Sequence, residues 1–294
     1  MTVLSERPLA VHGIRTLELE ITGKCQLSCS HCLSESGPQA THGEMTPTDW
    51  RNVITDAAAL GIPRVQLIGG EPTVHPQWRD FTGHALGLGL DVEVYSNLFH
   101  VARSWWETFQ RTGVTLATSY YSDDPDEHDR ITGKRGSYLR TRVNIEEALR
   151  RRVPVRVGIV AVLPGQRVDE ARTELEAMGV RRINTDRARA IGRAMLPGQS
   201  PALDEMCGGC TRGRAAVLPN GDLVGCVLSR DFPAGNVREH RLHELLVGRA
   251  WAELSASIPL RRSGGNPCNP DCNPSKDGSD CAPAEQEACD PAFE

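Results

Sequence analysis

The chain has 294 residues with a formal net charge of -5, and 39% of its residues are hydrophobic. This length suffices for one large domain with a smaller appendage. No apolar run reaches the roughly 18 residues that cross a membrane, and residues 1–15, an N-terminal extension, lack the apolar core of a signal peptide. The negative charge and the aromatic content of 5% disfavour a nucleic-acid partner. We expect a cytoplasmic protein that binds neither membranes nor nucleic acid.

Residues 16–198 alternate short apolar runs with longer amphipathic segments, which is the pattern of βα units on a parallel sheet. Strands are predicted at 17–21, 65–68, 92–95, 114–119, 155–162 and 182–187. Helices are predicted at 47–60, 78–88, 104–112, 140–152 and 168–178. The first helix has Thr46 as a candidate N-cap and Pro47 at its first position. Six βα units are too few to close an eight-stranded barrel.

Three cysteines, Cys25, Cys29 and Cys32, lie in one short loop directly after the first predicted strand. Thiolates are soft ligands that suit iron-sulfur clusters, and three of them hold only three irons of a 4Fe-4S cube. The fourth iron then stays open for a small molecule. Two other interpretations remain: a structural zinc site that includes His31, and disulfides, which need an oxidising compartment.

The segment Gly69-Gly70-Glu71-Pro72 follows the second predicted strand directly. Glycines let a backbone approach a ligand closely and proline fixes a turn, although such a segment can also be an ordinary strand-to-helix turn. Together, this segment and the C-x3-C-x2-C loop resemble the radical S-adenosylmethionine (SAM) superfamily. The resemblance implies an α/β fold with a partial (β/α)6, TIM-like barrel, whose site lies at the carboxyl ends of the strands.

The same resemblance implies the cofactors. Cys25, Cys29 and Cys32 hold a catalytic 4Fe-4S cluster in this interpretation, with SAM on the open iron. The segment 69–72 binds the amino group of SAM. An electron from the cluster cleaves SAM to a 5′-deoxyadenosyl radical, so a reducing partner such as flavodoxin or ferredoxin is expected.

Four further positions match the family more weakly, and a fifth, His31, departs mildly from it. The resemblance implies that Ser96 and Asn97 lie near the ribose of SAM. It implies that Ser119 and Arg156 meet the carboxylate of SAM. His31 stands where the family usually has an aromatic residue beside the adenine. Each of these side chains can instead be an ordinary core or surface group.

Two other segments each have two possible roles. Residues 120–128 are predicted to extend from the fourth strand over the cavity, where Tyr120 or Tyr121 either packs or relays a hydrogen atom. A second segment is crowded with arginines, which form either a solvated surface or a site for a substrate or carboxylate group. These arginines are Arg181, Arg182, Arg187, Arg189 and Arg193.

Seven of the ten cysteines lie in residues 199–294, which we predict to be a separate Cys-rich domain. A hairpin is predicted at 215–224. Cys207-x2-Cys210 and the later Gly-x4-Cys226 resemble the start of the SPASM or twitch-like auxiliary-cluster domain of radical SAM enzymes. The last four cysteines do not keep the spacing that is usual there: Cys268, Cys272, Cys281 and Cys289.

The resemblance to the SPASM domain implies one or two auxiliary 4Fe-4S clusters. One cluster is held by Cys207, Cys210 and Cys226, together with Cys268 or Cys272. The remaining three cysteines either ligate a second cluster or leave one free thiol, which can donate a hydrogen atom. Two zinc ribbons are the alternative for this region.

Fold alone does not fix a reaction. We expect first a radical SAM oxidoreductase or epimerase that abstracts a hydrogen from an unactivated carbon of a ribosomal peptide, giving a crosslink, a thioether or an epimerised residue. A separate leader-binding protein is a further expected partner, because only about fifteen residues precede the first strand. The alternatives are a dehydrogenase or epimerase of a sugar, aminocyclitol or other natural-product intermediate, and a non-catalytic iron-sulfur or zinc protein.

Overall fold

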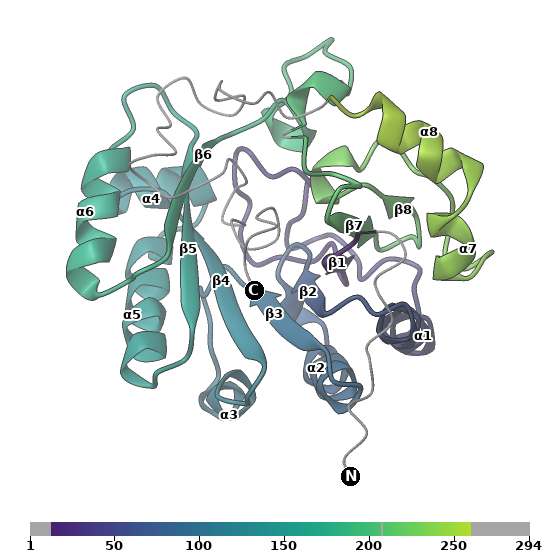
Figure 1. The fold of residues 1–294 in the computed structure, drawn as a ribbon. Coiled ribbons are helices and arrows are strands. Elements are labelled where there is room, and N and C mark those ends of the chain that lie inside the picture. The colour runs from purple at the N-terminus through teal and green to yellow at the C-terminus, as the bar shows by residue number, and fades with distance from the viewer. Residues whose placement is uncertain (1–12, 207, 260–294) are drawn as a thin grey trace.

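In the computed structural model, which describes residues 13–206 and 208–259, eight strands form one sheet in the order β6-β5-β4-β3-β2-β1-β7-β8 (Figure 1). All neighbouring strands pair in parallel except β7 and β8, which are antiparallel. The strands are β1 (Thr16–Glu20), β2 (Arg64–Ile68), β3 (Asp91–Tyr95), β4 (Val114–Tyr120), β5 (Val155–Ala161), β6 (Ile183–Arg187), β7 (Arg214–Val217) and β8 (Leu223–Val224). The sheet curves into a partial barrel.

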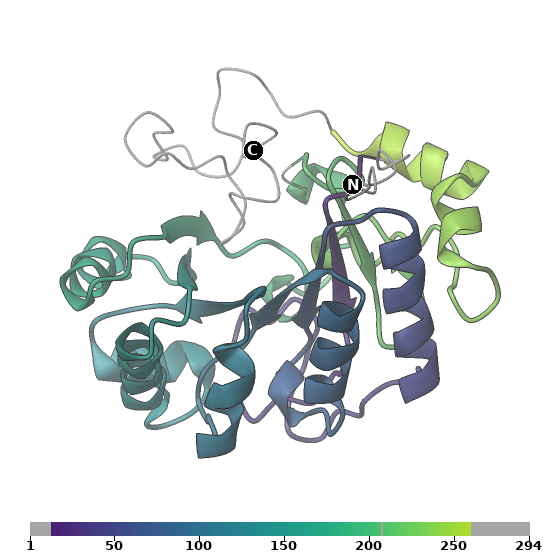
Figure 2. The same cartoon turned by 60° about the horizontal axis from the view of Figure 1, so that its bottom comes forward.

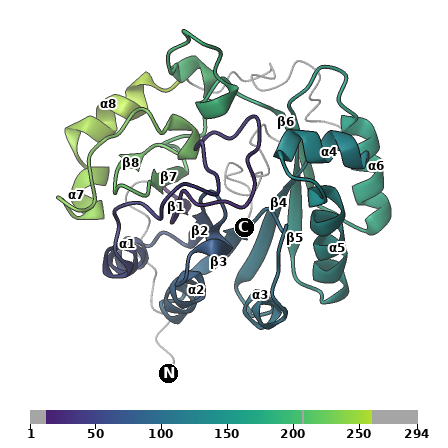
Figure 3. The same cartoon turned by 180° about the vertical axis from the view of Figure 1, so that it is seen from behind.

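The helices lie mainly on the outer, convex side of this sheet, as Figures 1 and 3 show from opposite sides. The α-helices are α1 (Pro47–Ala59), α2 (Trp78–Gly87), α3 (Trp106–Phe109), α4 (Pro125–Thr132), α5 (Ser137–Arg150), α6 (Val168–Met178), α7 (Leu242–Leu246) and α8 (Arg249–Ser257). The 3-10 helices are η1 (Pro72–Val74), η2 (Arg103–Trp105), η3 (Gly192–Ala194), η4 (Leu203–Glu205) and η5 (Val227–Ser229). Figure 2 shows α1 and α2 side by side against the sheet.

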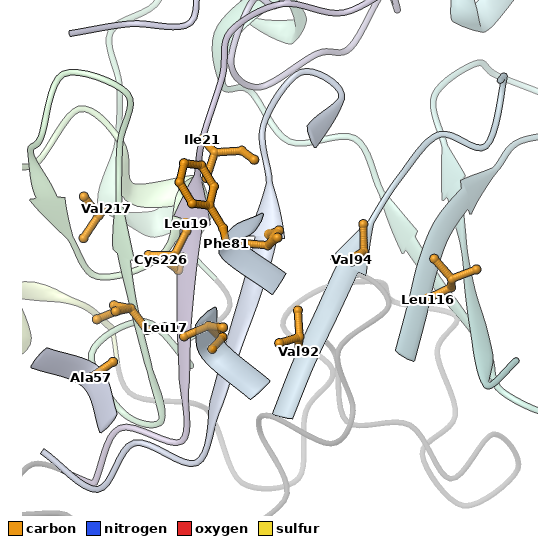
Figure 4. Packing of buried hydrophobic residues seen from close by; sticks show 14 of the residues in the cluster. Leu17, Leu19, Ile21, Ala57, Phe81, Val92, Val94, Leu116, Val217 and Cys226 are labelled. Atoms are coloured by element: carbon orange, nitrogen blue, oxygen red, sulfur yellow. The ribbon is translucent and has the colours of Figure 1, made fainter. Parts of the chain in front are cut away.

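The core lies between the sheet and this helical layer. Leu17 and Leu19 of β1 are fully buried and belong to one apolar cluster with Phe81 of α2 (Figure 4). Successive residues of a strand point to opposite faces, so Glu18 and Glu20 face the inside of the barrel. One face of β1 therefore stabilises the fold, and the other is available to a site.

The α/β fold and the six strands predicted for the parallel sheet are confirmed. Helix α1 begins as expected, with Thr46 and Asp49 forming a capping box around Pro47. The hairpin predicted between Cys210 and Cys226 is present as β7 and β8. Residues 120–128, for which no helix was predicted, contain the start of α4, whose N-cap is Asp124.

Strand β7 belongs to the Cys-rich segment 199–294, yet it pairs in parallel with β1 of the barrel, with Thr16 opposite Arg214 and Leu19 opposite Val217. The first strands of this segment therefore extend the barrel sheet. Within residues 13–206 and 208–259, no helix is both long and apolar enough to cross a membrane.

Candidate functional site

A cavity of about 210 Å³ lies inside the partial barrel. Its lining contains Cys25, Cys29 and Cys32 together with Gly69 and Gly70. It also contains Cys226 of the segment after β7. One cavity thus contacts both sets of cysteines that the sequence singles out.

The end of α4 holds the loop that carries the three N-terminal cysteines. The N–H of Ser28 donates to the carbonyl of Thr132 at 3.1 Å, and the N–H of Ser30 donates to the carbonyl of Ile131 at 2.9 Å. These two bonds fix the middle of the loop, between Cys25 and Cys32, against a helix.

A second anchor comes from η3, which follows β6. The N–H of Arg193 donates to the carbonyl of Cys32 at 3.1 Å, and its Nε donates to the carbonyl of Cys29 at 2.8 Å. Gly192 has a φ of 55°, and a Cβ there would collide with the carbonyls of Cys32 and Leu33. Only glycine lets η3 approach the cysteine loop so closely.

The segment after β2 forms the third anchor. The N–H of Gly70 donates to the carbonyl of Thr22 at 2.8 Å, and the N–H of Glu71 donates to the carbonyl of Lys24 at 2.8 Å. A Cβ on Gly70 would collide with the carbonyl of Lys24. The glycines therefore bring this segment against the start of the cysteine loop.

Glu71 is completely buried behind the cavity, and this burial raises the pKa of its carboxyl group. Its carboxylate accepts hydrogen bonds from the hydroxyl of Thr73 at 2.6 Å and from the N–H of Asn97 at 2.7 Å. Glu71 thus positions Asn97. The side chain of Asn97 in turn reaches the cysteine loop, because its Nδ2 donates to Sγ of Cys25 at 3.5 Å.

The cysteine sulfur atoms lie in surroundings that disfavour free thiolates. Burial raises the pKa of Cys25 and of Cys29 to about 12. Two donors nevertheless point at Sγ of Cys25, namely Nδ2 of Asn97 and the N–H of Leu27 at 3.4 Å. A bound metal supplies the positive charge that makes such thiols ionise.

Polar atoms without partners lie next to these cysteines. In the part of the chain that the structure describes, Nδ1 of His31 and Nη2 of Arg193 are buried and have no hydrogen-bond partner. Both residues line the cavity, and burial lowers the pKa of His31 to about 4, so its imidazole is neutral. A soft donor set with unpaired polar atoms beside it fits an iron-sulfur cluster and a polar ligand such as SAM. The residues present therefore fit both groups.

Most of the predicted residues for SAM lie in or next to the cavity. His31, Gly69, Gly70, Asn97 and Ser119 line it. Glu71, Pro72 and Ser96 are buried but are absent from the lining. Glu71 holds Asn97, which does line the cavity.

Arg156 lies elsewhere, which corrects the expectation that it meets the carboxylate of SAM. Its Nε and Nη2 donate to the carboxylate of Glu93 at 2.7 and 2.6 Å, and both residues are buried. Arg156 is the second residue of β5, so it lies near the amino end of the strand, whereas the cavity lies at the carboxyl ends. It is not among the residues that line the cavity.

The tyrosine pair after β4 divides between two roles. The hydroxyl of Tyr120 donates to Glu174 at 2.7 Å, and so does the hydroxyl of Tyr138. Tyr120 is therefore a packing residue with a satisfied hydroxyl. Tyr121 lines the cavity and meets the ring of His31, with ring centroids 5.1 Å apart.

The crowded arginines separate in the same way. Arg181 and Arg182 precede β6 and are exposed, whereas Arg187, Arg189 and Arg193 follow the strand or end it and line the cavity. The role of Arg193 in holding the cysteine loop was not predicted from the sequence. Glu18 and Glu20 were also missed, although acidic residues at alternate positions of an apolar strand are a signal of an inward-facing polar site.

Two of the C-terminal cysteines are brought together. Cys210 and Cys226 are buried, their Cα atoms are 5.1 Å apart, and their sulfur atoms are in contact. The other predicted ligands of this region lie outside the described residues: Cys207, Cys268, Cys272, Cys281 and Cys289.

The comparisons with known proteins agree with this geometry. The family model described as Radical SAM superfamily matches residues 19–178, and the SPASM model, described as an iron-sulfur cluster-binding domain, matches residues 207–274. A protein of Ruegeria pomeroyi named PqqA peptide cyclase is 27% identical over 208 residues, which cover 68% of this chain and 50% of that protein. A protein of a Thermoplasmatales archaeon named S-adenosylmethionine-dependent nucleotide dehydratase is 27% identical over 154 residues, covering 52% and 55%.

Among solved structures, Streptococcus suis SuiB bound to S-adenosylmethionine has the same fold, with a TM-score of 0.69 and 15% identity over 83% of this chain and 69% of that chain. The chain spans about half the length of the curated relatives it matches. The matches to these two families imply that the cofactors are 4Fe-4S clusters and SAM. The chain belongs to the radical SAM superfamily and carries a C-terminal SPASM iron-sulfur domain.

Proposed function

We propose that this chain cleaves SAM and abstracts a hydrogen atom from an unactivated carbon of a ribosomally made peptide. The observation that carries this proposal is that one cavity has both the N-terminal cysteines and Cys226 in its lining. A 4Fe-4S cluster held by Cys25, Cys29 and Cys32 would supply the electron for cleavage of SAM, and a substrate in the cavity would lie next to these cysteines and Cys226. The product is a crosslink, a thioether or an epimerised residue.

The chain's own residues have distinct parts in this proposal. Cys25, Cys29 and Cys32 hold the catalytic cluster. Asn97 and the N–H of Leu27 donate to Sγ of Cys25, which stabilises it as a thiolate. The walls bury the reacting atoms and exclude water, because a reactive radical must not be quenched by solvent.

The unpaired polar atoms beside the cysteines provide contacts for SAM. Nη2 of Arg193 is a donor suited to a carboxylate group, and the neutral ring of His31 has a nitrogen free for a ligand. Gly69 and Gly70 expose backbone to the cavity next to them. These atoms replace the contact that the sequence assigned to Arg156.

A peptide substrate is supported by the name of the relative from Ruegeria pomeroyi, a peptide cyclase. A reducing partner such as flavodoxin or ferredoxin and a separate leader-binding protein complete this proposal. A cytoplasmic location fits such a reducing partner and reactive thiols.

The second candidate is a radical SAM dehydrogenase or epimerase of a small natural-product intermediate. The size of the cavity, about 210 Å³, favours a small reacting group. The relative named as a nucleotide dehydratase is an example of a family member with a small-molecule name. The two candidates differ in substrate but share the cysteine loop and the cavity.

The test uses anaerobically reconstituted full-length protein with SAM and dithionite. Wild type should form 5′-deoxyadenosine, and the Cys25→Ala/Cys29→Ala/Cys32→Ala variant should form none. The Cys210→Ala/Cys226→Ala variant is the matched control, because it removes buried thiols yet leaves the N-terminal loop intact. Absence of 5′-deoxyadenosine in the wild type would overturn the proposed chemistry.

Substrate class is tested separately by mass spectrometry with candidate precursor peptides. A peptide that loses two hydrogens or gains one deuterium from heavy water identifies a peptide enzyme. If SAM cleavage is stimulated by sugars or aminocyclitols and by no peptide, the second candidate is correct.

A further inference from the structure

Two buried acidic side chains on β1 connect the barrel to the segment that carries Cys226. Glu18 is 0% exposed and Glu20 is 2% exposed, and both line the cavity. A carboxylate in the interior is stable only when it is paired and hydrogen-bonded. The hydrogen-bond partners of Glu18 and Glu20 therefore show which segments these two side chains hold in place.

Glu18 holds the backbone immediately after Cys226. One oxygen of its carboxylate, Oε2, accepts a hydrogen bond from the N–H of Val227 at 2.8 Å. The other, Oε1, accepts from Nη1 of Arg214 at 2.8 Å, and Arg214 is the first residue of β7. The carboxylate thus joins β1 to both sides of the Cys-rich hairpin.

Glu20 holds the other end of the same short segment. Its two carboxylate oxygens accept from Nη1 and Nη2 of Arg230 at 3.0 and 3.3 Å, and Arg230 directly follows η5. Within η5, the hydroxyl of Ser229 accepts from the N–H of Cys226 at 3.0 Å. The turn that contains Cys226 is therefore tied to β1 at its beginning and at its end.

The same strand leads into the other cysteine set, since Cys25 follows Glu20 by five residues. Strand β1 is central in the sheet, between β2 and β7, so it has little freedom to move. A group bound at Cys226 and a group bound at Cys25 are consequently held against one rigid element.

We infer that Glu18 and Glu20 are positioning residues for the auxiliary iron-sulfur group. They fix the turn that contains Cys226 against β1, and this turn carries a ligand of the group. This inference rests on the SPASM iron-sulfur domain, and not on the proposed reaction, for the presence of that group. Glu18 acts most directly, because its bond to Val227 is one residue from the ligand. Its carboxylate would also disfavour reduction of a cluster held by Cys226, since reduction adds negative charge.

The test compares Glu18→Ala and Glu18→Gln by iron content, EPR spectroscopy and redox titration. Glu18→Ala should lose about four irons per chain with their EPR signal and should keep the cluster of the N-terminal loop. Glu18→Gln retains an oxygen that accepts from Val227. It should recover the lost irons, and the midpoint potential of the auxiliary cluster should move to a more positive value.

Glu93 provides the matched control, because it is also buried in the sheet and also paired to an arginine, Arg156, yet contacts neither cysteine set. Glu93→Ala and Glu93→Gln should keep the auxiliary irons and their potential. If Glu93→Ala loses the same irons as Glu18→Ala, the effect is general destabilisation and the inference is wrong. If Glu18→Ala keeps the auxiliary cluster at an unchanged potential, the inference is wrong as well.

Failure of the proposed function would have a different signature. Wild-type protein would then contain no iron beyond that bound by the N-terminal loop, or would form no 5′-deoxyadenosine. The first result removes the group that Glu18 is inferred to position and overturns the inference. The second, with auxiliary irons present in the wild type and lost in Glu18→Ala, overturns the function and supports the positioning role.

Discussion

Nδ2 of Asn97 lies 3.5 Å from Sγ of Cys25, although 72 residues separate them in the chain. Glu71 sets this contact from behind by accepting the N–H of Asn97. The Gly-Gly-Glu-Pro segment therefore also acts on the cysteine loop through the segment that follows β3.

The first prediction concerns this contact. N–H donors to sulfur stabilise the reduced, more negative form of a cluster. Asn97→Ala should lower the midpoint potential of the N-terminal cluster by about 40 mV, which corresponds to one hydrogen bond of roughly 1 kcal/mol. Asn144→Ala is the control, because Asn144 donates to the carbonyl of Leu98 and does not line the cavity. Equal potentials in the wild type and Asn97→Ala would show that the contact is without influence.

The second prediction concerns Arg193. Arg193→Ala removes the hydrogen bond to the carbonyl of Cys29, and a bond from a charged donor is worth about 1.5 kcal/mol or more. Iron should therefore leave the N-terminal loop to a chelator about tenfold faster. Arg172→Ala serves as the control, since Arg172 bonds Thr185 from α6. Identical release rates in all three proteins would contradict the anchoring role.

The third prediction uses two glycines with similar left-handed backbones. Gly192 (φ 55°) faces the carbonyls of Cys32 and Leu33, whereas a Cβ on Gly165 (φ 70°) meets nothing within 4 Å. Gly165→Ala should lower the free energy of unfolding by about 1–2 kcal/mol through backbone strain alone. Gly192→Ala should lower it further and should also reduce iron loading. Urea unfolding and iron analysis measure both effects, and equal behaviour of the two variants would refute the close approach of η3.

The fourth prediction concerns pH. Burial lowers the pKa of His128 and of His75 to about 4, while an unfolded histidine titrates near 6.5. Between these values the unfolded chain binds protons that the folded chain excludes, so the free energy of unfolding should fall as pH drops from about 6.5 to about 4.

His128→Phe should flatten this dependence, because the unfolded variant no longer has an imidazole at position 128 to protonate. The substitution keeps an aromatic ring among the tyrosines. His240→Phe, at an exposed position, is the comparison variant. Urea unfolding of the metal-free protein at a series of pH values measures the slope. A slope in His128→Phe as steep as in the wild type would contradict the burial effect.

Much of the fold was predictable because its signals are local. The cysteine spacing, the glycine segment after β2 and the capping box at Thr46 each lie within a few residues of one another. Helix α4 was missed, although Asp124, Pro125 and the acids that follow are a start signal for a helix.

The remaining differences are non-local. Arg156 bonds Glu93 and does not reach the cavity because it lies near the amino end of β5. Its position along the strand is not revealed by residue type alone. The division of the arginines around β6 follows from which end of the strand each occupies. Pairing of β7 with β1 joins segments about two hundred residues apart, and no short motif marks such a partner.

That pairing has a consequence for synthesis of the protein on the ribosome. Strand β1 emerges first, but one of its edges stays open until residues 214–217 have been made. Unpaired strand edges are sites of aggregation, and contacts between distant segments form slowly. The growing chain therefore exposes the strand beside its own iron-binding loop while the residues between β1 and β7 are made. We therefore expect the protein to be most prone to aggregation before β7 has paired with β1 and before iron is inserted. Chaperones that cover the open edge of β1 should protect it at this stage.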